Sequence, residues 1–286
     1  MRCDLHVHTI HSGMCNIPLL SAVCRESYSD PETLYSTLKR KGMSMVTVTD
    51  HDSIDAVESL RRHPDFFVSE EVTCTLPSGG EMHVGVYDVS ERQHLELQHR
   101  RHDFESLIAY LREQRLFFSA NHIFSSLTGR RHAADFEAFE AEFDAFETRN
   151  GCMLEVTNRN AAEYAERLGK IGLGGSDAHT LATAGSCWTE VPGARNKAEF
   201  FAGLRHGRGI VYGTHGSYGR LTRDILQIGV SMMQTSPLTA PVALLGGFAP
   251  VITFINYILE KRFSATWSQR LTGVRSLQAE VSEVAA

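Results

Sequence analysis

The sequence has no excess of positive charge. Its 286 residues include 28 Lys and Arg against 34 Asp and Glu, which gives a formal net charge of −6. Duplex-binding proteins usually have a basic excess, because their affinity comes largely from neutralising phosphates. The composition therefore argues against stable duplex nucleic-acid binding, whereas a single substrate phosphate needs only a local basic patch.

Other features are missing as well. The six cysteines are scattered and form no C-x-x-C pair, which argues against a zinc ribbon and for free thiols in a reducing compartment. The N-terminus has no apolar stretch behind a basic start, as a secretory signal would. We therefore expect a cytoplasmic protein. Neither a P-loop pattern nor a low-complexity linker occurs.

Histidine, in contrast, is abundant. The chain has 14 His, about twice the average usage, which favours a metal or proton-transfer site. The remaining composition, with 42% hydrophobic and 22% charged residues, is typical of a globular protein.

Strand-like and helix-like segments alternate up to about residue 215, which predicts βα units and a parallel sheet. We expect one α/β barrel domain over residues 1–220 and a helical extension over 221–286. Phe136, Phe139, Phe143 and Phe146 predict one surface helix with its phenylalanines on the barrel. The predicted strands cover residues 3–7, 45–49, 116–120, 153–156 and 171–174.

Side chains with metal-binding chemistry follow the predicted strands or lie between them. Because functional residues of a parallel α/β barrel lie at the carboxyl ends of its strands, we expect these side chains to meet at one mouth. Imidazoles and carboxylates bind divalent ions of the Zn, Mn and Fe type. The candidates are His6, His8, His51, Glu71, His83, His122, Asp177 and His179.

Several motifs around these residues resemble those of the PHP (polymerase and histidinol phosphatase) domain, in the same order. The resemblance covers about residues 1–215. It implies a distorted (β/α)7 TIM-like barrel and a two- or three-metal centre with Mn, Fe or Zn that hydrolyses phosphate esters. The motifs are residues 4–9 (DLHVHT), 48–52 (VTDHD), 71–73 (EVT), 81–84 (EMHV), 121–122 (NH) and 175–179 (GSDAH).

The resemblance also implies roles for these residues. One ion would be held by His6, His8, Glu71 and Asp177, with Glu71 bridging to a second ion held by His83 and His122. Glu70 remains an alternative to Glu71. His51 and His179 would face a third ion or donate a proton to the leaving group. The catalytic candidates are these two histidines and Asp177. Asp50 and Asp52 are expected to orient histidine ligands.

The first motif departs from the family pattern. Many relatives have an Asp or His after the second histidine that completes the third metal site, but this chain has Gly13 there. Either the third ion is absent or weakly held, or His11 or Cys15 takes the place of that ligand.

Two arginines follow His122 in the next loop. Guanidinium groups suit phosphate oxygens, so Arg130 and Arg131 are the candidates for substrate binding, with a solvated surface loop as the equal alternative.

Residues 225–259 contain no charged side chain. The length would allow a membrane span, but prolines and glycines interrupt the run. We expect an apolar helical extension that packs on the barrel or on a second copy of the chain; a contact with a membrane surface is the alternative.

Two other functions remain open. A different metallohydrolase, such as an amidohydrolase, also uses an H-x-H motif after its first strand, but it usually relies on a lysine that no predicted strand end carries here. The chain could instead be a metal-binding regulatory or scaffold module whose catalysis has decayed. The substrate stays open between a small-molecule monoester and a nucleotide or oligonucleotide end.

Overall fold

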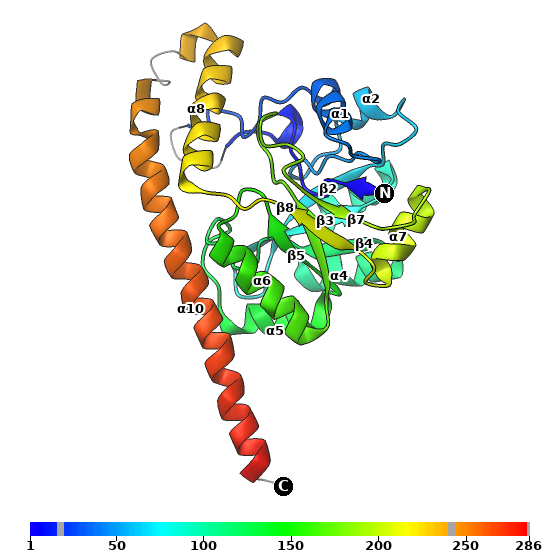
Figure 1. The fold of residues 1–286 in the computed structure, drawn as a ribbon, viewed down its shortest axis with the longest axis vertical. Coiled ribbons are helices and arrows are strands. Elements are labelled where there is room, and N and C mark those ends of the chain that lie inside the picture. The colour runs from blue at the N-terminus through cyan, green and yellow to red at the C-terminus, as the bar shows by residue number, and fades with distance from the viewer. Residues whose placement is uncertain (16–19, 240–243, 285–286) are drawn as a thin grey trace.

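The computed structural model describes residues 1–15, 20–239 and 244–284, which form a mixed α/β fold (Figure 1). The elements follow one another in this order: β1 (Arg2–Cys3), η1 (Ile10–Ser12), α1 (Pro31–Arg40), α2 (Val57–Leu60), β2 (Ser69–Thr75), β3 (Glu81–Tyr87), α3 (Glu91–Arg100), α4 (Phe104–Glu113), β4 (Phe117–Ala120), α5 (Ala133–Glu142), β5 (Ala145–Asn150), α6 (Glu155–Leu168), β6 (Ile171–Gly175), β7 (Cys187–Glu190), α7 (Lys197–Arg205), β8 (Ile210–Gly213), α8 (Tyr218–Thr235), η2 (Pro237–Thr239), η3 (Leu244–Phe248) and α10 (Ala249–Val284).

The named strands form two sheets. One has the order β1-β7-β8 and is antiparallel throughout, and the other has the order β2-β3-β4-β5-β6. In the larger sheet β2, β3 and β4 pair antiparallel, while β4, β5 and β6 pair parallel. The expectation of a purely parallel sheet is therefore wrong.

Short bridges connect the segments that carry the first two histidine motifs. Val7 pairs in parallel with Ala178, just beyond β6, and its carbonyl accepts a hydrogen bond of 2.9 Å from the N–H of Thr49. His51 in turn pairs in parallel with Glu71 of β2. The segments around residues 7 and 49 therefore lie side by side between β6 and β2.

Side chains cap the first turns of α1 and α7. Asp30 accepts a hydrogen bond of 2.9 Å from the N–H of Thr33, with Pro31 as the first residue of α1. Asn196 caps α7 in the same way, through the N–H of Glu199 at 2.9 Å. These side chains satisfy backbone donors that have no partner inside a helix.

Two predictions in the middle of the chain are wrong. Residues 153–156 form no strand, because α6 begins at Glu155 and the strand of this unit is β5. The four phenylalanines do not share one helix: Phe136 and Phe139 lie on α5, Phe143 follows it, and Phe146 belongs to β5. All four are nevertheless buried, because helix and strand face the same core.

Helix α10 runs along the side of the domain, and its first turns lie beside α8 (Figure 1). Its middle part is anchored: the ring of Trp267 lies 4.9 Å from that of Phe136, and Asn160 donates a hydrogen bond of 2.7 Å to Oγ of Ser264. Glu260 also accepts a hydrogen bond of 2.8 Å from the N–H of Ser126, in the loop after His122.

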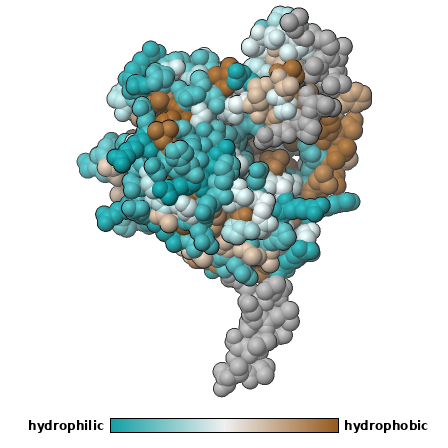
Figure 2. Space-filling model, turned by 180° about the vertical axis from the view of Figure 1, so that it is seen from behind, coloured by the Kyte–Doolittle hydropathy of each residue, from teal (hydrophilic) through white to brown (hydrophobic). Residues whose placement is uncertain are grey.

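The first turns of α10 have an exposed apolar side, visible in Figure 2. Within the part of the chain that the structure describes, no helix combines the length and apolar character that crossing a bilayer requires. Of the apolar run 225–259, residues 240–243 lie outside the described residues. The exposed residues are Val251, Ile252, Phe254, Ile255 and Leu259, preceded by Phe248 at the end of η3.

Candidate metal centre

Glu71 on β2 is the centre of a buried cluster of histidines. Its carboxylate is buried, and each oxygen faces ring nitrogens that come from other segments. Such crowding of nitrogens around one carboxylate is typical of a metal site. The nearest approaches to Oε2 are His6 Nε2 at 3.0 Å, His51 Nδ1 at 3.4 Å and His8 Nε2 at 3.5 Å, and those to Oε1 are His122 Nε2 at 3.3 Å and His83 Nδ1 at 3.4 Å.

Asp177, just after β6, provides a second carboxylate. Its Oδ1 lies 3.2 Å from Nε2 of His8 and 3.5 Å from Nε2 of His6. Asn150 donates a hydrogen bond of 3.0 Å to the other oxygen. The backbone of Asp177 has a φ of 51° and that of His122 a φ of 30°. Strained backbone of this kind clusters at functional sites.

The separations between these atoms suit a bound cation. Two ligand atoms that each lie about 2 Å from one tetrahedral ion are about 3.3 Å apart. Nε2 of His8 and Nδ1 of His83 are buried and make no hydrogen bond to any described residue. Unpaired buried nitrogens of this kind are expected where a metal ion is the missing partner. The donor set therefore fits divalent ions.

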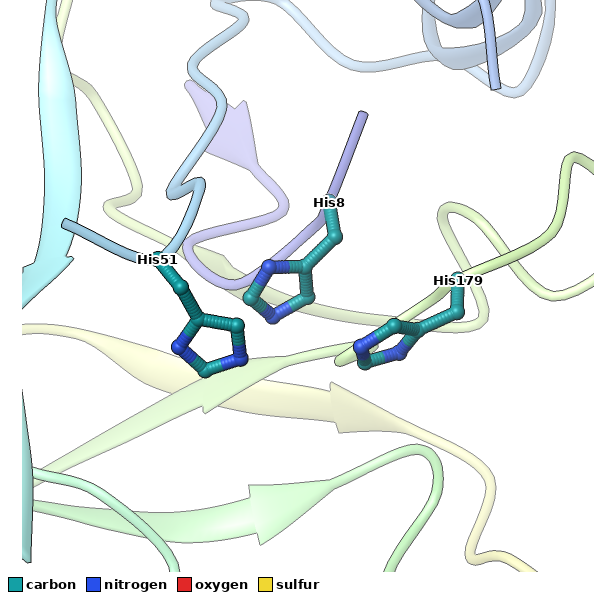
Figure 3. A group of neighbouring side chains, drawn as sticks. All are labelled: His8, His51 and His179. Atoms are coloured by element: carbon teal, nitrogen blue, oxygen red, sulfur yellow. The ribbon is translucent and has the colours of Figure 1, made fainter. Parts of the chain in front are cut away.

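Four triads of potential ligands occur among the described residues, with the ligand atoms of each triad within 4.8 Å of one another. The triads are His6, His8 and Asp177; His6, Glu71 and His122; His51, Glu71 and His83; and His8, His51 and His179 (Figure 3 shows the last).

Neighbouring groups fix the tautomer of the histidines. Nδ1 of His6 donates to Glu147 Oε1 at 2.8 Å, because a carboxylate can only accept, and the ring is thereby turned so that Nε2 lies 3.0 Å from Glu71 and 3.5 Å from Asp177. Nδ1 of His8 contacts Oγ of Ser12 at 2.9 Å. Such partners orient metal-binding imidazoles and raise their basicity.

Asp50 and Asp52, both expected to orient histidines, differ in what they touch. Asp50 accepts a hydrogen bond of 2.7 Å from Ser12, and therefore acts on His8 through that hydroxyl. Asp52 accepts hydrogen bonds from the N–H of Thr73 at 2.8 Å and from Arg101 at 2.8 Å. It therefore holds β2 in place through Thr73.

The charges in the cluster are arranged for cation binding. Burial opposes the charged form of Glu71 and Asp177, but the surrounding histidines, His6 first, outweigh it and hold the pKa of both carboxyls well below their usual range. Burial lowers the pKa of His51 well below its ordinary value and also lowers that of His8, whereas at His6 and His122 the neighbouring carboxylates, Glu71 first, outweigh burial and raise the pKa. Ionised carboxylates and neutral imidazoles are the states that bind metal ions.

The structure brings all eight predicted ligands together and separates Glu71 from its alternative. Neighbouring residues of a strand point to opposite faces of a sheet. Glu70 accordingly accepts hydrogen bonds from Nδ1 of His94 at 2.9 Å and from Gln98 at 2.8 Å, on the outer side of β2. It is not part of the cluster.

The two arginines predicted to bind substrate have different surroundings. Arg131 is buried, and its guanidinium donates to the carbonyl of Glu81 and to Oγ1 of Thr128. These contacts of Arg131 connect the loop after His122 to β3. Arg130 is exposed.

Three polar residues around the cluster were not predicted to contact it, although Asn121 belongs to one of the motifs. Glu147 lies on β5, where no strand was expected, and binds both His6 and, at 3.1 Å, the N–H of His122. Asn121 donates a hydrogen bond of 2.9 Å to Glu71. Glu26 has its Oε2 3.2 Å from Nε2 of His51, and burial, which Glu71 and Asp177 reinforce against the opposing effect of His179, raises its pKa to about 7.

Comparison with known proteins agrees with the motif pattern. A family model described as PHP-associated matches residues 156–208. An uncharacterized protein of Methanocaldococcus jannaschii is 33% identical over 69 residues, which is 24% of this chain and 39% of that protein. The chain thus matches well under half of the length of this relative.

Two crystal structures have a similar fold. One is a two-domain protein from Bacteroides vulgatus that contains a predicted PHP-like metal-dependent phosphoesterase; the TM-score is 0.55 at 16% identity, over 77% of this chain and 68% of that one. The other is PsfC from Pseudomonas syringae, with a TM-score of 0.55 at 19% identity, over 82% of this chain and 98% of that one. The fold is thus similar to that of a PHP-like protein, and the resemblance of the chain to the PHP family is confirmed.

Proposed function

We propose that the protein is a metal-dependent phosphoesterase that hydrolyses a phosphate ester with water as the nucleophile. The observation that carries this proposal is the arrangement of imidazole nitrogens at 3.0 to 3.5 Å around the Glu71 carboxylate. We also propose that the fold is a distorted (β/α)7 barrel, in which the segments around residues 7 and 49 would complete the ring between β6 and β2. The bridges Val7–Ala178 and His51–Glu71 support this part of the proposal.

Two groups of residues would hold divalent ions, Mn, Fe or Zn. His6, His8 and Asp177 would hold one ion, His83 and His122 would hold another, and Glu71 would bridge the two. Ions of this kind supply an activated water molecule and positive charge opposite the phosphate.

The chain itself contributes orientation and charge. Glu147 and Ser12 hold the rings of His6 and His8 so that Nε2 of each points into the cluster. Asp177 and Glu71 remain ionised and provide negative charge that attracts cations. His179 has a side chain that is 26% exposed, which leaves it able to meet a substrate at the rim. His51 is deeper and neutral, which suits a ligand better than a proton donor.

The loop after His122 contains the candidate for substrate recognition. Arg130 is the exposed cation of the loop after His122, so it remains the candidate for the substrate phosphate. A small-molecule monoester agrees with the net charge of −6. A nucleotide or oligonucleotide end remains the second possibility.

The test is phosphate release by protein reconstituted separately with manganese, iron and zinc. The substrates are sugar phosphates, histidinol phosphate, nucleotides and short oligonucleotides. Activity should disappear in Asp177→Asn and persist in Asp55→Asn, whose carboxylate is exposed. Absence of release from fully metallated protein would overturn the proposal and favour the regulatory module. Hydrolysis of amides without phosphate release would favour the amidohydrolase reading.

A further inference from the structure

The segments 13–15 and 24–26 pair with each other and place Glu26 opposite Gly13. Gly13 is the position at which the family motif usually has a ligand of the third metal ion. The carbonyl of Gly13 accepts a hydrogen bond of 3.2 Å from the N–H of Glu26, and the N–H of Cys15 donates to the carbonyl of Cys24 at 2.9 Å. Between these contacts Met14 and Arg25 form an antiparallel bridge. A side chain at Glu26 can therefore reach the space that Gly13 leaves open.

The next residue fixes this segment to the cluster. Oγ of Ser27 lies 3.0 Å from the carbonyl of His179 and 3.3 Å from that of His8. Glu26 is thereby held beside the histidines that follow the first and last strands of the site.

The carboxylate of Glu26 points at His51. Its Oε2 lies 3.2 Å from Nε2 of His51, and it is buried without a hydrogen bond to any described residue. The side chain as a whole is only 15% exposed. An ionised carboxylate in such a place is costly unless a positive charge is near.

Three imidazoles lie around the same space (Figure 3). The ring of His8 is stacked between the other two, with centroids 4.7 Å from His51 and 4.4 Å from His179. The buried Nε2 of His8 lacks a hydrogen-bond partner among the described residues. Rings packed so closely cannot all be protonated, and their nitrogens are available to a cation.

We propose that Glu26 binds a third divalent cation together with His51 and His179, in place of the side chain that Gly13 lacks. This inference rests on the proposed function, because it requires the cluster to hold metal ions. Glu26, His11 and Cys15 all lie outside the tightest groups of potential ligands among the described residues, but of the three only Glu26 has a recorded side-chain contact with His51.

The test counts bound ions. The full chain is stripped with a chelator and dialysed against a series of Mn²⁺ concentrations, and bound manganese per chain is measured by mass spectrometry for wild type, Glu26→Gln and the exposed control Glu58→Gln. We expect three ions per wild-type and control chain. Glu26→Gln should retain two and bind the third at least about tenfold more weakly, which is the order of loss found when a supporting group of a metal site is removed.

Thermal unfolding without metal shows whether Glu26→Gln is folded. If its Tm differs from that of the wild type, a double variant separates an effect on metal binding from an effect on stability. If Glu26 and His179 bind the same ion, adding Glu26→Gln to His179→Gln should weaken the third ion little further. Three ions bound with unchanged affinity in Glu26→Gln, or two ions only in wild type, would overturn the inference while leaving the proposed function intact. A wild-type chain without bound manganese, iron or zinc would overturn both.

Discussion

Nδ1 of His6 donates a hydrogen bond of 2.8 Å to Oε1 of Glu147, and the two residues are 141 positions apart in the chain. The contact joins the first histidine motif to β5. It aims Nε2 of His6 between the carboxylates of Glu71 and Asp177, at 3.0 and 3.5 Å. Glu147 is therefore a positioning residue for the whole cluster.

Replacing Glu147 should weaken metal binding without removing a ligand. In Glu147→Gln the amide oxygen can still accept from His6, but the negative charge that raises the basicity of the ring is lost. We expect manganese affinity to fall about 10- to 100-fold, as measured by isothermal titration calorimetry. Glu137→Gln, on the exposed side of α5, is the matched control. Equal affinities in the two variants would show that Glu147 does not support the site.

A second prediction concerns Gly175, at the end of β6. A Cβ at this position would lie 2.3 Å from Cβ of His6 and 2.5 Å from its backbone nitrogen. Gly175→Ala should therefore displace His6, destabilise the protein by about 1–3 kcal/mol and weaken metal binding. Gly219→Ala, where the structure records no atom within 4 Å, should be neutral or slightly stabilising because α8 gains a better helix former. Denaturant unfolding of both variants checks this, and unchanged metal affinity in Gly175→Ala would contradict the close approach.

Bound metal should stabilise the fold in a pH-dependent way. At an ion concentration about 100 times the dissociation constant, a single site adds about 2.7 kcal/mol. Protons compete with metal for imidazole nitrogens, so the gain should be present at neutral pH and fall as the pH drops below about 6.5. Calorimetric Tm values with manganese and with chelator, from pH 5 to 8, measure it. A difference in Tm that does not change with pH would mean that the histidines are not the ligands.

Helix α10 should contribute to stability through Trp267, which is 6% exposed and packs on Phe136. Trp267→Ala should lower the free energy of unfolding by about 3–5 kcal/mol, because a large buried side chain is removed. Phe254→Ala on the same helix is the control, since Phe254 is 53% exposed and should change stability by no more than about 0.5 kcal/mol. Equal, small effects would show that α10 is not anchored at Trp267.

The ligand cluster could be predicted from the sequence because each histidine or acid sits in a short local motif. The groups that hold the ligands in place were not predictable. Glu147 and Glu26 touch His6 and His51, residues 141 and 25 positions away, and the chemistry of an isolated glutamate does not tell which contact it makes. The strand β5 was not predicted for a related reason. The phenylalanines keep the helical spacing of three and four residues from α5 into β5, so the sequence pattern indicated one helix.

If the protein is a metal-dependent enzyme, Glu71 and Asp177 bind divalent ions. An anomalous difference map from crystals grown with manganese, with data collected above and below the manganese absorption edge, locates such ions. We expect peaks between Glu71, Asp177 and the histidines around them, and a loss of the shared peaks in Glu71→Gln. A map without peaks at these residues, or with peaks only on the protein surface, would contradict this expectation.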